Sequence, residues 1–514
     1  MRLGHFDGYG VRANVAGPLR YDAEMRAADI ATDDSMMQTC DLAVVGGGIA
    51  GLTTALRAAE LGLTAVVLEQ GADVRYACNT RYSGGILHAA FFDPNRPVDE
   101  LRALVKKALA PLGDPALVET VVIDTRRFLA WLRGHDVRFM RVGPAEAHRW
   151  CIAPPKPIGP GLEWRGRGSD VLLRTLTDAL HARGGRVVLS AHAERLERGV
   201  NGAWRIHGTA NGRASVWSAR GVALCDGGFQ GDIGQLRRHI GPAPERFLQR
   251  GAANSRGDGM RMALEAGAAV EGLDAFYGHV QSRDALTDSR VWPYPEVDNV
   301  AAAAIVVDPQ GRRLCDEGLG GISVANALAR LPDPASATIV LDSAIWERAG
   351  RSARFPANPF LERYGGTLHR AETLEALAAT AGIDARRLVA TVNAYNDALA
   401  RDALHTLTPP RSATKARAWP IVAPPYLAIP LCVGITFTMG GIVIDGDGCV
   451  LDTARQRIRG LYAAGSATAG LDGRASNGFV AYAGGLVKAV FGLRAAEHLA
   501  QALRIDEAQP AAAD

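Results

Sequence analysis

The sequence lacks several patterns that would place it in a familiar class. No apolar run approaches the ~20 residues that a membrane-spanning helix needs, and the net charge of +3 gives no broad basic surface for nucleic acid. The seven cysteines form no C-x-x-C pair, so the usual signatures of zinc ribbons, cysteine-ligated clusters and c-type haem attachment are missing. We therefore expect a cytoplasmic protein with no transmembrane segment, nucleic-acid partner or metal site, whose cysteines are mostly small core residues.

The two ends of the chain carry little pattern. With 514 residues, the chain is long enough for two or more domains. Residues 1–38 show neither a clear period nor the apolar core of a signal peptide. We expect them to form an irregular arm, unless the true start is Met36 or Met37. Residues 503–514 are expected to be a tail.

The sequence is organised around a glycine-rich stretch. Residues 42–45 are apolar and mostly β-branched, which is typical of a buried parallel strand. Gly46, Gly48 and Gly51 follow with G-x-G-x-x-G spacing, which allows a tight turn, a close approach to pyrophosphate and packing of helix on strand. A second apolar run ends at Glu69, where a carboxylate accepts a hydrogen bond from a ribose 2′-OH. This arrangement predicts a dinucleotide site and disfavours NADP, which leaves NAD and FAD.

Three later segments bring glycines and small polar residues to the ends of predicted strands. Residues 79–85 are able to place N–H groups and hydroxyls against a polar ring or a phosphate, but on local grounds alone an ordinary surface turn is favoured. A glycine pair in residues 226–229 permits close backbone approach. Asp258 caps the helix that follows it, accepts a hydrogen bond from a cofactor hydroxyl, or does both.

Apolar periodicity predicts alternating strands and helices, with a change of character in the middle of the chain. The expected helices lie within 98–140, 169–183, 260–266, 373–400 and 479–499. The expected strands are 42–45, 65–68, 186–189, 217–224, 303–307, 338–341, 442–444 and 461–466. We interpret residues 275–432 as a second domain inserted into the first.

Taken together, these stretches resemble the flavoprotein family of fumarate reductase and succinate dehydrogenase, from about residue 41 to residue 500. The resemblance rests on the glycine motif, Glu69, and residues 79–85, 226–229, 257–259 and 460–465. Residues 434–438, Gly-Ile-Thr-Phe-Thr, together with Tyr277-Gly278-His279, are most similar to the tricarballylate dehydrogenase branch. The 3-ketosteroid dehydrogenases are more distant relatives.

The resemblance implies FAD as the cofactor and an α/β fold. A doubly wound, Rossmann-like FAD-binding domain (39–274 and 433–502) would carry an inserted α+β cap domain (275–432) that closes over the flavin ring, with the substrate between them. The final helix would direct its N-terminus, near Gly478, at the flavin, where it stabilises negative charge. The family's covalent attachment uses a histidine that residues 79–85 lack, so we expect non-covalent FAD.

The residues expected to hold FAD come from all of these segments. They are Gly46, Gly48, Ile49, Ala50, Gly51, Glu69, Gln70, Asn79, Thr80, Ser83, Gly84, Gly85, Ala193, Gly227, Asp258, Gly465, Ser476, Asn477, Gly478 and Phe479.

Several departures from the family concern the substrate. The family's G-x-R-F-x-x-E stretch is residues 311–317 here, and the proton-donor arginine that follows it is missing from residues 318–323. Phe437 replaces a substrate-binding histidine, and Ser466 replaces the acid that contacts the ribitol. Arg474 is the nearest candidate for the substrate-binding arginine. These departures make fumarate itself an unfavourable candidate substrate.

We predict an FAD-dependent oxidoreductase that acts on a CH–CH bond. The main hypothesis is desaturation of a carboxylic acid or ketone by hydride transfer to flavin N5, with His279 orienting the substrate or moving a proton and Arg474 clamping a carboxylate. For His279 a structural role remains an alternative, and for Arg474 a surface role does. A reductase of an activated alkene and a non-catalytic electron-transfer subunit are the other hypotheses. Because the sequence has no haem motif, a separate electron acceptor or donor is expected.

Overall fold

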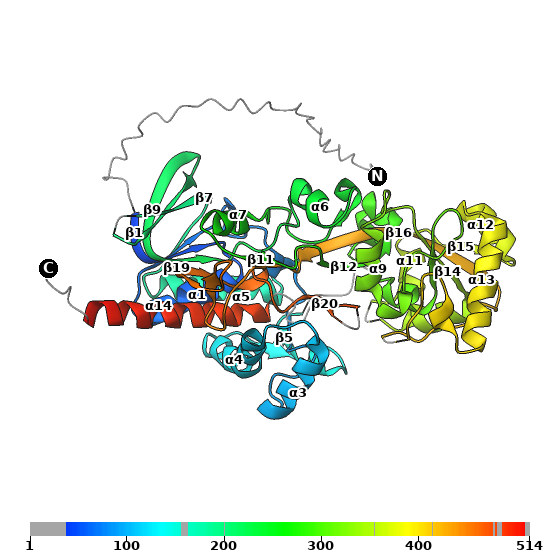
Figure 1. Cartoon of the computed structure of the whole chain (residues 1–514), viewed down its shortest axis with the longest axis horizontal. Helices are drawn as coiled ribbons and strands as arrows, with labels where there is room; N and C mark the ends of the chain where they lie inside the picture. Colours follow the sequence, from blue (N-terminus) through cyan, green and yellow to red (C-terminus); the bar gives the residue numbers. More distant parts are fainter. Residues whose placement is uncertain are drawn as a thin grey trace, which may run out of the picture. The chain divides into compact units, whose positions relative to one another are not determined.

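The computed structural model describes residues 38–155, 163–199, 201–293, 295–353, 355–413, 415–475, 478–480 and 486–508 (Figure 1). The predicted N-terminal arm lies outside these residues, except for Gln38, which begins the first strand. Ser476 and Asn477, two of the predicted FAD contacts, also lie outside them.

An eight-stranded sheet carries the glycine motif. Its strands are β1 (Gln38–Val45), β2 (Ala65–Leu68), β6 (Arg186–Val188), β7 (Ala191–Arg198), β8 (Trp204–Ala210), β9 (Arg213–Leu224), β18 (Cys449–Leu451) and β19 (Arg457–Ala463). The main path is β18-β19-β9-β1-β2-β6, and β8 and β7 extend it from β9. β1 pairs in parallel with both β2 and β9, as β2 does with β6 and β9 with β19. The predicted parallel strands at the glycine motif are confirmed.

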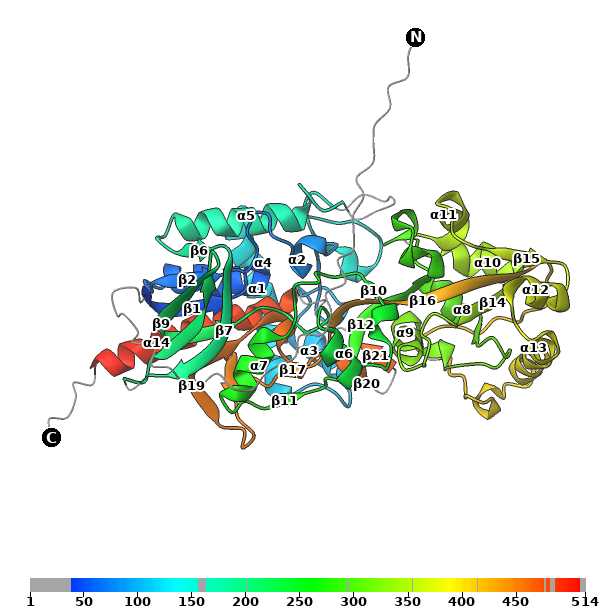
Figure 2. The ribbon, with the colours of Figure 1, turned by 90° about the horizontal axis from the view of Figure 1, so that it is seen from above.

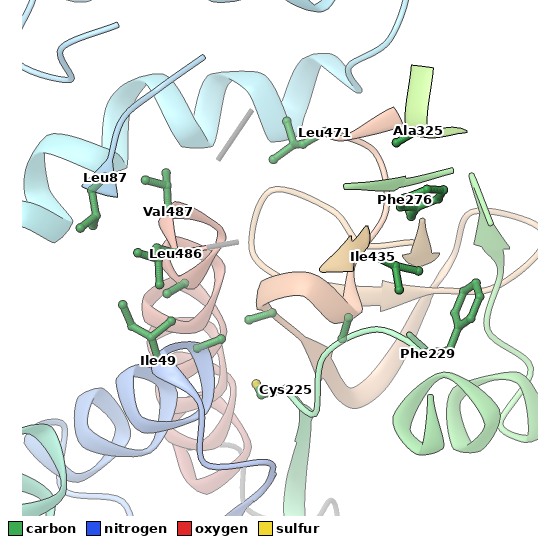
Figure 3. Close-up of a cluster of buried hydrophobic side chains, with 14 of the residues drawn as sticks. Ile49, Leu87, Cys225, Phe229, Phe276, Ala325, Ile435, Leu471, Leu486 and Val487 are labelled. Carbon is green, nitrogen blue, oxygen red and sulfur yellow. The ribbon is translucent and has the colours of Figure 1, made fainter. Parts of the chain in front are cut away.

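Helices bury the apolar side chains that face out of this sheet. α1 (Ile49–Glu60) begins directly after the glycine turn and contacts both α5 (Gly168–His181) and α14 (Val490–Ala508). Leu52 and Leu56 on α1 are fully buried. Figure 3 shows Ile49, at the start of α1, beside Leu486, shortly before α14 begins. The start of α1 is thus fixed against the hydrophobic core.

The other helices lie between these strands and in the middle of the chain. They are α2 (Asn79–Tyr82), α3 (Val98–Leu109), α4 (Pro115–Gly134), α6 (Ile233–His239), α7 (Asp258–Glu265), α8 (Asp298–Ala303), α9 (Gly321–Leu328), α10 (Ser343–Arg348), α11 (Ala357–Arg363), α12 (Leu374–Ala381) and α13 (Ala385–Ala400). The helices predicted within 98–140, 260–266 and 373–400 are confirmed. In the part of the chain that the structure describes, none of the helices is both long and apolar enough to cross a membrane.

A second, six-stranded sheet is built along one long strand. Its strands are β10 (Leu248–Gln249), β12 (Phe276–Ser282), β13 (Ile305–Val307), β14 (Thr338–Asp342), β15 (His369–Ala371) and β16 (Tyr426–Thr438). The first part of β16 pairs with β14 and β15, and its second part pairs with β12 and β10 (Figure 2). The sequence pattern does not predict β16, and the predicted domain boundary between residues 432 and 433 falls inside it.

Three smaller sheets complete the described structure. They are β3 (Ile86–Leu87) with β4 (Phe139–Met140) and β5 (Trp150–Ile152), β11 (Val270–Glu271) with β17 (Gly441–Ile442), and β20 (Gly473–Ala475) with β21 (Gly478–Val480). The helix predicted to start at Phe479 is therefore wrong at its beginning, because Gly478–Val480 is a strand and α14 starts at Val490. α14 also runs to Ala508, into the predicted tail.

Candidate active site

A cavity of about 550 Å³ joins the glycine turn after β1 to the sheet formed by β12 and β16. Most of the residues predicted to hold FAD line it, and so does one of the two predicted catalytic residues. The predicted residues in its lining are Gly46, Gly48, Ile49, Ala50, Glu69, Gln70, Asn79, Thr80, Ser83, Gly84, Gly85, Ala193, Gly227, Asp258, His279 and Gly465.

The glycine turn is held by close backbone contacts. Gly46 has φ +96°, and a Cβ there would lie 2.7 Å from the Cα of Asp226. A Cβ at Gly51 would lie 1.9 Å from the carbonyl oxygen of Gly46. Gly51 therefore packs α1 against the turn and does not line the cavity. Its predicted role in helix packing fits this position, whereas a direct contact with FAD does not.

The N-terminus of α1 opens into the cavity. Gly48 is its N-cap and has no side chain to satisfy the first N–H groups. The hydroxyl of Thr80 accepts a hydrogen bond from Ile49 N at 3.1 Å. Free N–H groups at the positive end of a helix form a site for an anion such as a pyrophosphate.

Glu69 lies at the carboxyl end of β2 and is buried. Its Oε2 accepts a hydrogen bond from Gly47 N and its Oε1 accepts one from Gly71 N, both at 2.8 Å. Burial raises the pKa of this carboxyl, and the two backbone hydrogen bonds oppose the rise. Each carboxylate oxygen has a second lone pair that is able to accept a hydrogen bond, so Glu69 retains the capacity to accept one from a ribose hydroxyl.

Two aspartates, Asp226 and Asp258, lie close together at the start of α7 (Asp258–Glu265). The N–H of Gly259, in the first turn of α7, donates to Asp226 Oδ2 at 2.8 Å. Asp258 instead contacts His192 Nε2 at 3.3 Å and lines the cavity. Asp226 thus takes the capping role that was one alternative for Asp258, and the other alternative, a cofactor contact by Asp258, stays a prediction. Burial, with the nearby Asp258 charge, raises the pKa of Asp226 to about 7.

The segment predicted as a loop at 79–85 begins with the short helix α2, which connects the cavity wall to β16. Asn79 Nδ2 donates to the carbonyl oxygen of Thr436 at 3.1 Å, and Asn79 Oδ1 accepts from Ala252 N at 2.6 Å. Arg81 does not face the cavity, because its guanidinium forms a buried ion pair with Asp170 at 3.0 Å. The segment lines the cavity and is not an ordinary surface turn.

At the other end of the cavity, β12 presents Tyr277 and His279 from the same strand. The Tyr277 hydroxyl and His279 Nε2 are 3.1 Å apart, and His279 Nδ1 is hydrogen-bonded to Asp298. The ring of Tyr277 stacks on Phe437 of β16, with centroids 5.0 Å apart. Tyr277 pairs with Phe437 and Gly278 with Ile435, so the register leaves Thr436 as an extra residue in a β-bulge.

Arg250 is a cavity residue that the sequence reasoning missed. Its backbone N–H donates to the Ile435 carbonyl oxygen at 2.7 Å, and its Nη1 donates to Thr436 Oγ1 at 3.1 Å. A Cβ at Gly434 would lie 2.4 Å from Arg250 Cδ, so the arginine side chain lies directly over this glycine. Within the described residues, Arg250 forms no ion pair and its buried Nε has no hydrogen-bond partner.

The remaining predicted residues lie elsewhere. Arg474 lies on β20 with an exposed side chain and is not part of the cavity lining. Gly478 begins β21, where a Cβ would lie 2.5 Å from Ser323 Oγ, and Phe479 follows it on the same strand. Gly478 does not line the cavity.

Comparisons with known proteins agree with this geometry. The model of the FAD binding domain family matches residues 41–478. The chain belongs to this family. It is 24% identical over 481 residues to the NADH:fumarate oxidoreductase of Klebsiella pneumoniae, a match that covers 90% of this chain but only 48% of that protein. It is also 24% identical over 475 residues to a fumarate reductase (cytochrome) of Shewanella frigidimarina, covering 88% and 77% of the two chains.

The solved structures include a protein with the same fold. The 3-ketosteroid-Δ4-(5α)-dehydrogenase of Rhodococcus jostii superposes with a TM-score of 0.67 at 21% identity, over 93% of this chain and 100% of that one. The predicted family resemblance, the predicted α/β fold class and FAD as the cofactor are therefore confirmed. The two relatives, named as an oxidoreductase and a reductase, support the prediction of an FAD-dependent oxidoreductase.

The cavity itself fits FAD. Asp226 Oδ1 and Asn254 Oδ1 are buried at its lining and have no hydrogen-bond partner among the described residues. Buried acceptors of this kind are costly unless a ligand donates to them, and the hydroxyls of FAD are suitable donors. The N–H groups at the start of α1 that follow Ile49 supply the anion site that the pyrophosphate needs.

Proposed function

We propose that the protein is an FAD-dependent oxidoreductase that acts on a CH–CH bond next to a carboxylate, most favourably in the direction of desaturation. Bound FAD supplies the acceptor or donor of a hydride. The observation that carries the proposal is an arginine, Arg250, which has no counter-charge among the residues that the structure describes and lies in the same cavity as the FAD-binding residues and His279.

The setting of Arg250 favours a carboxylate over a neutral ketone. A partly buried guanidinium that lacks an anionic partner is unfavourable, and a bound carboxylate corrects this with charge-assisted hydrogen bonds. The hydrogen bonds to Ile435 and Thr436 fix the arginine in place. We therefore assign the clamping role to Arg250 instead of Arg474, whose exposed position outside the cavity lining does not favour it.

We further propose that FAD is held without a covalent bond by the predicted residues that line the cavity, with Asp226 and Asn254 added to them. The 79–85 segment contains no histidine. A separate electron acceptor and a cytoplasmic location complete the proposal. The location is supported by the seven cysteines, all of which are free. The division into an FAD-binding domain and a cap domain at 275–432 remains a proposal as well.

The reverse reaction, reduction of an activated alkene, is the second candidate. It is favoured by the names of the two relatives, both of which act on fumarate. Fumarate itself remains unfavourable, because Phe437 takes the position of the family's substrate histidine and residues 318–323 lack the proton-donor arginine.

The first test is anaerobic. The purified holoenzyme is titrated with saturated carboxylates and cyclic ketones, and the flavin absorbance is followed. After chemical reduction it is titrated with the corresponding unsaturated compounds. Bleaching by a saturated acid supports desaturation, reoxidation only by an unsaturated compound supports the reductase, and no reaction with any compound contradicts the proposed function.

The second test separates the two arginines. Malonate and its neutral analogue malonamide are titrated against the flavin spectrum of wild type, Arg250→Ala and Arg474→Ala. We expect Arg250→Ala to weaken malonate binding by about 30-fold or more, since a charged hydrogen-bonded pair contributes about 2–3 kcal/mol. FAD content and the weak binding of malonamide should not change. If malonate affinity falls only in Arg474→Ala, the carboxylate-binding role belongs to Arg474 and not to Arg250.

A further inference from the structure

A chain of three side chains leads from the cavity into the protein. The hydroxyl of Tyr277 lies 3.1 Å from His279 Nε2, and His279 Nδ1 is hydrogen-bonded to Asp298 at the start of α8. Tyr277 and His279 line the cavity, whereas Asp298 does not. The order from the cavity inward is therefore hydroxyl, imidazole, carboxylate.

The partners of Asp298 fix the direction of these hydrogen bonds. Asp298 Oδ1 accepts a hydrogen bond from Val280 N at 3.1 Å, so the carboxylate is held as an acceptor. Its Oδ2 then accepts from His279 Nδ1–H. His279 Nε2 is left as the acceptor for the hydroxyl of Tyr277. This is the arrangement in which an imidazole takes a proton from a hydroxyl while a carboxylate stabilises the resulting cation.

Space for Asp298 is created at Gly321, the first residue of α9. A Cβ at Gly321 would lie 2.2 Å from both Cγ and Oδ1 of Asp298. Gly321 belongs to residues 318–323, the segment that lacks the family's proton-donor arginine. Any side chain at this position would displace the carboxylate from His279. The absence of an arginine and the presence of the three-residue chain are thus two aspects of one local structure.

We propose that Tyr277 is the residue that exchanges a proton with the substrate carbon, and that His279 and Asp298 are positioning residues that act through it. This inference rests on the proposed function. In desaturation, a C–H bond breaks, its proton goes to Tyr277 Oη, and the phenolic proton passes to His279 Nε2. The electron pair of that C–H bond forms the new π bond, and the hydride that leaves the neighbouring carbon would have bound, oxidised FAD as its acceptor. In the reductive direction each transfer is reversed.

The phenol suits this role in the cavity. Stacking on Phe437 fixes the ring plane, and the hydrogen bond to His279 fixes the hydroxyl. Arg250 reaches Thr436 on β16, the strand that pairs with β12, and thereby places a cation in the same cavity. A carboxylate held by Arg250 would bring its neighbouring carbons toward the β12 side chains. A positively charged clamp also stabilises the enolate-like charge that develops when the proton leaves.

The test uses the holoenzyme and four named oxidants of reduced flavin: fumarate, cis-aconitate, crotonate and 2-cyclohexen-1-one. The flavin is reduced with dithionite, and its reoxidation is followed in wild type, Tyr277→Phe, His279→Asn and the double variant. We expect Tyr277→Phe to slow reoxidation by about 10²–10⁴-fold with unchanged FAD content and malonate affinity. The double variant should be no slower than Tyr277→Phe alone, because residues of one unit are not additive.

The matched control is Tyr462→Phe. The Tyr462 hydroxyl lies 3.0 Å from His498 Nδ1, so this variant also breaks a tyrosine–histidine hydrogen bond, but outside the cavity lining. It should reoxidise at the wild-type rate. If wild type reacts and Tyr277→Phe reacts within about threefold of it, the proton-transfer role is wrong and the proposed function survives. If wild type reacts with none of the four oxidants and is not bleached by any saturated acid, both are overturned.

Discussion

A single methyl group at Gly321 should disconnect Asp298 from His279. The Cβ of a Gly321→Ala variant would lie 2.2 Å from the Asp298 carboxylate, so the carboxylate must move by more than 1 Å to reach van der Waals distance. It then loses its hydrogen bonds to His279 and to Val280 N. Hydrogen bonds of a charged group contribute about 1.5–3 kcal/mol each, and replacing glycine within a helix returns about 0.5–1 kcal/mol. The net destabilisation expected from the loss of both hydrogen bonds is about 2–5 kcal/mol.

The assay compares the thermal unfolding midpoint and the flavin reoxidation rate of the holoenzyme with those of wild type. The expected result is a fall of about 2–4 °C in the midpoint. The reoxidation rate should be about tenfold lower, because the His279 imidazole that is hydrogen-bonded to Tyr277 no longer has Asp298 to orient it. Gly134→Ala is the control, since a Cβ at the end of α4 meets no atom within 4 Å. If Gly321→Ala matched Gly134→Ala in both measurements, the close packing of Asp298 and the role assigned to it would be refuted.

Three further predictions concern the FAD end of the cavity and its support. Gly51→Val should abolish FAD binding while leaving a partly folded protein, because its Cβ would lie 1.9 Å from the Gly46 carbonyl oxygen; normal FAD content after purification would contradict this. Arg81→Met should lower the free energy of unfolding by about 3–5 kcal/mol, because the buried Asp170 loses its buried partner and keeps only the partly exposed Arg174 at 3.8 Å, as urea unfolding can measure. Asp226→Asn should flatten the pH dependence of stability of the apoprotein. The raised pKa of Asp226, about 7, means that the folded state binds this proton more tightly than the unfolded state. The wild-type free energy of unfolding should therefore fall by up to about 2 kcal/mol between pH 5 and pH 7.5. An equal fall in the variant would refute the assignment.

The FAD end of the site could be predicted because its chemistry is local in sequence. The strand, the glycine turn and the start of α1 are adjacent, and Glu69 ends the next strand, so spacing alone places them together. The sequence does not predict the capping role of Asp226, because Asp258 is adjacent in sequence to the start of α7, whereas Asp226 reaches it only in the folded protein. The sequence gives no signal that decides which of two such carboxylates reaches the helix.

The substrate end depends on contacts between distant segments. Arg250 meets Thr436 across 186 residues of sequence, and its neighbourhood shows no periodicity that marks it. Asp298 reaches His279 only because Gly321 leaves room. Arg474 is the sequence's candidate for binding the substrate because it stands just before the expected final helix, but β20 and β21 occupy residues 473–475 and 478–480 instead. β16 itself was missed because its apolar run is interrupted by Pro430 and Gly434, which weaken a strand pattern.

The length of β16 limits how this protein can be divided or recombined. One strand pairs with β14 through its first residues and with β12 through its last, so both sets of partners share a single register. Inserting or deleting one residue near Leu431 would turn Thr436 and Phe437 to the opposite face of the sheet, so that both side chains leave the cavity wall. Swapping residues 275–432 between relatives would therefore transfer half a strand, and a functional chimera needs its junctions outside residues 426–438.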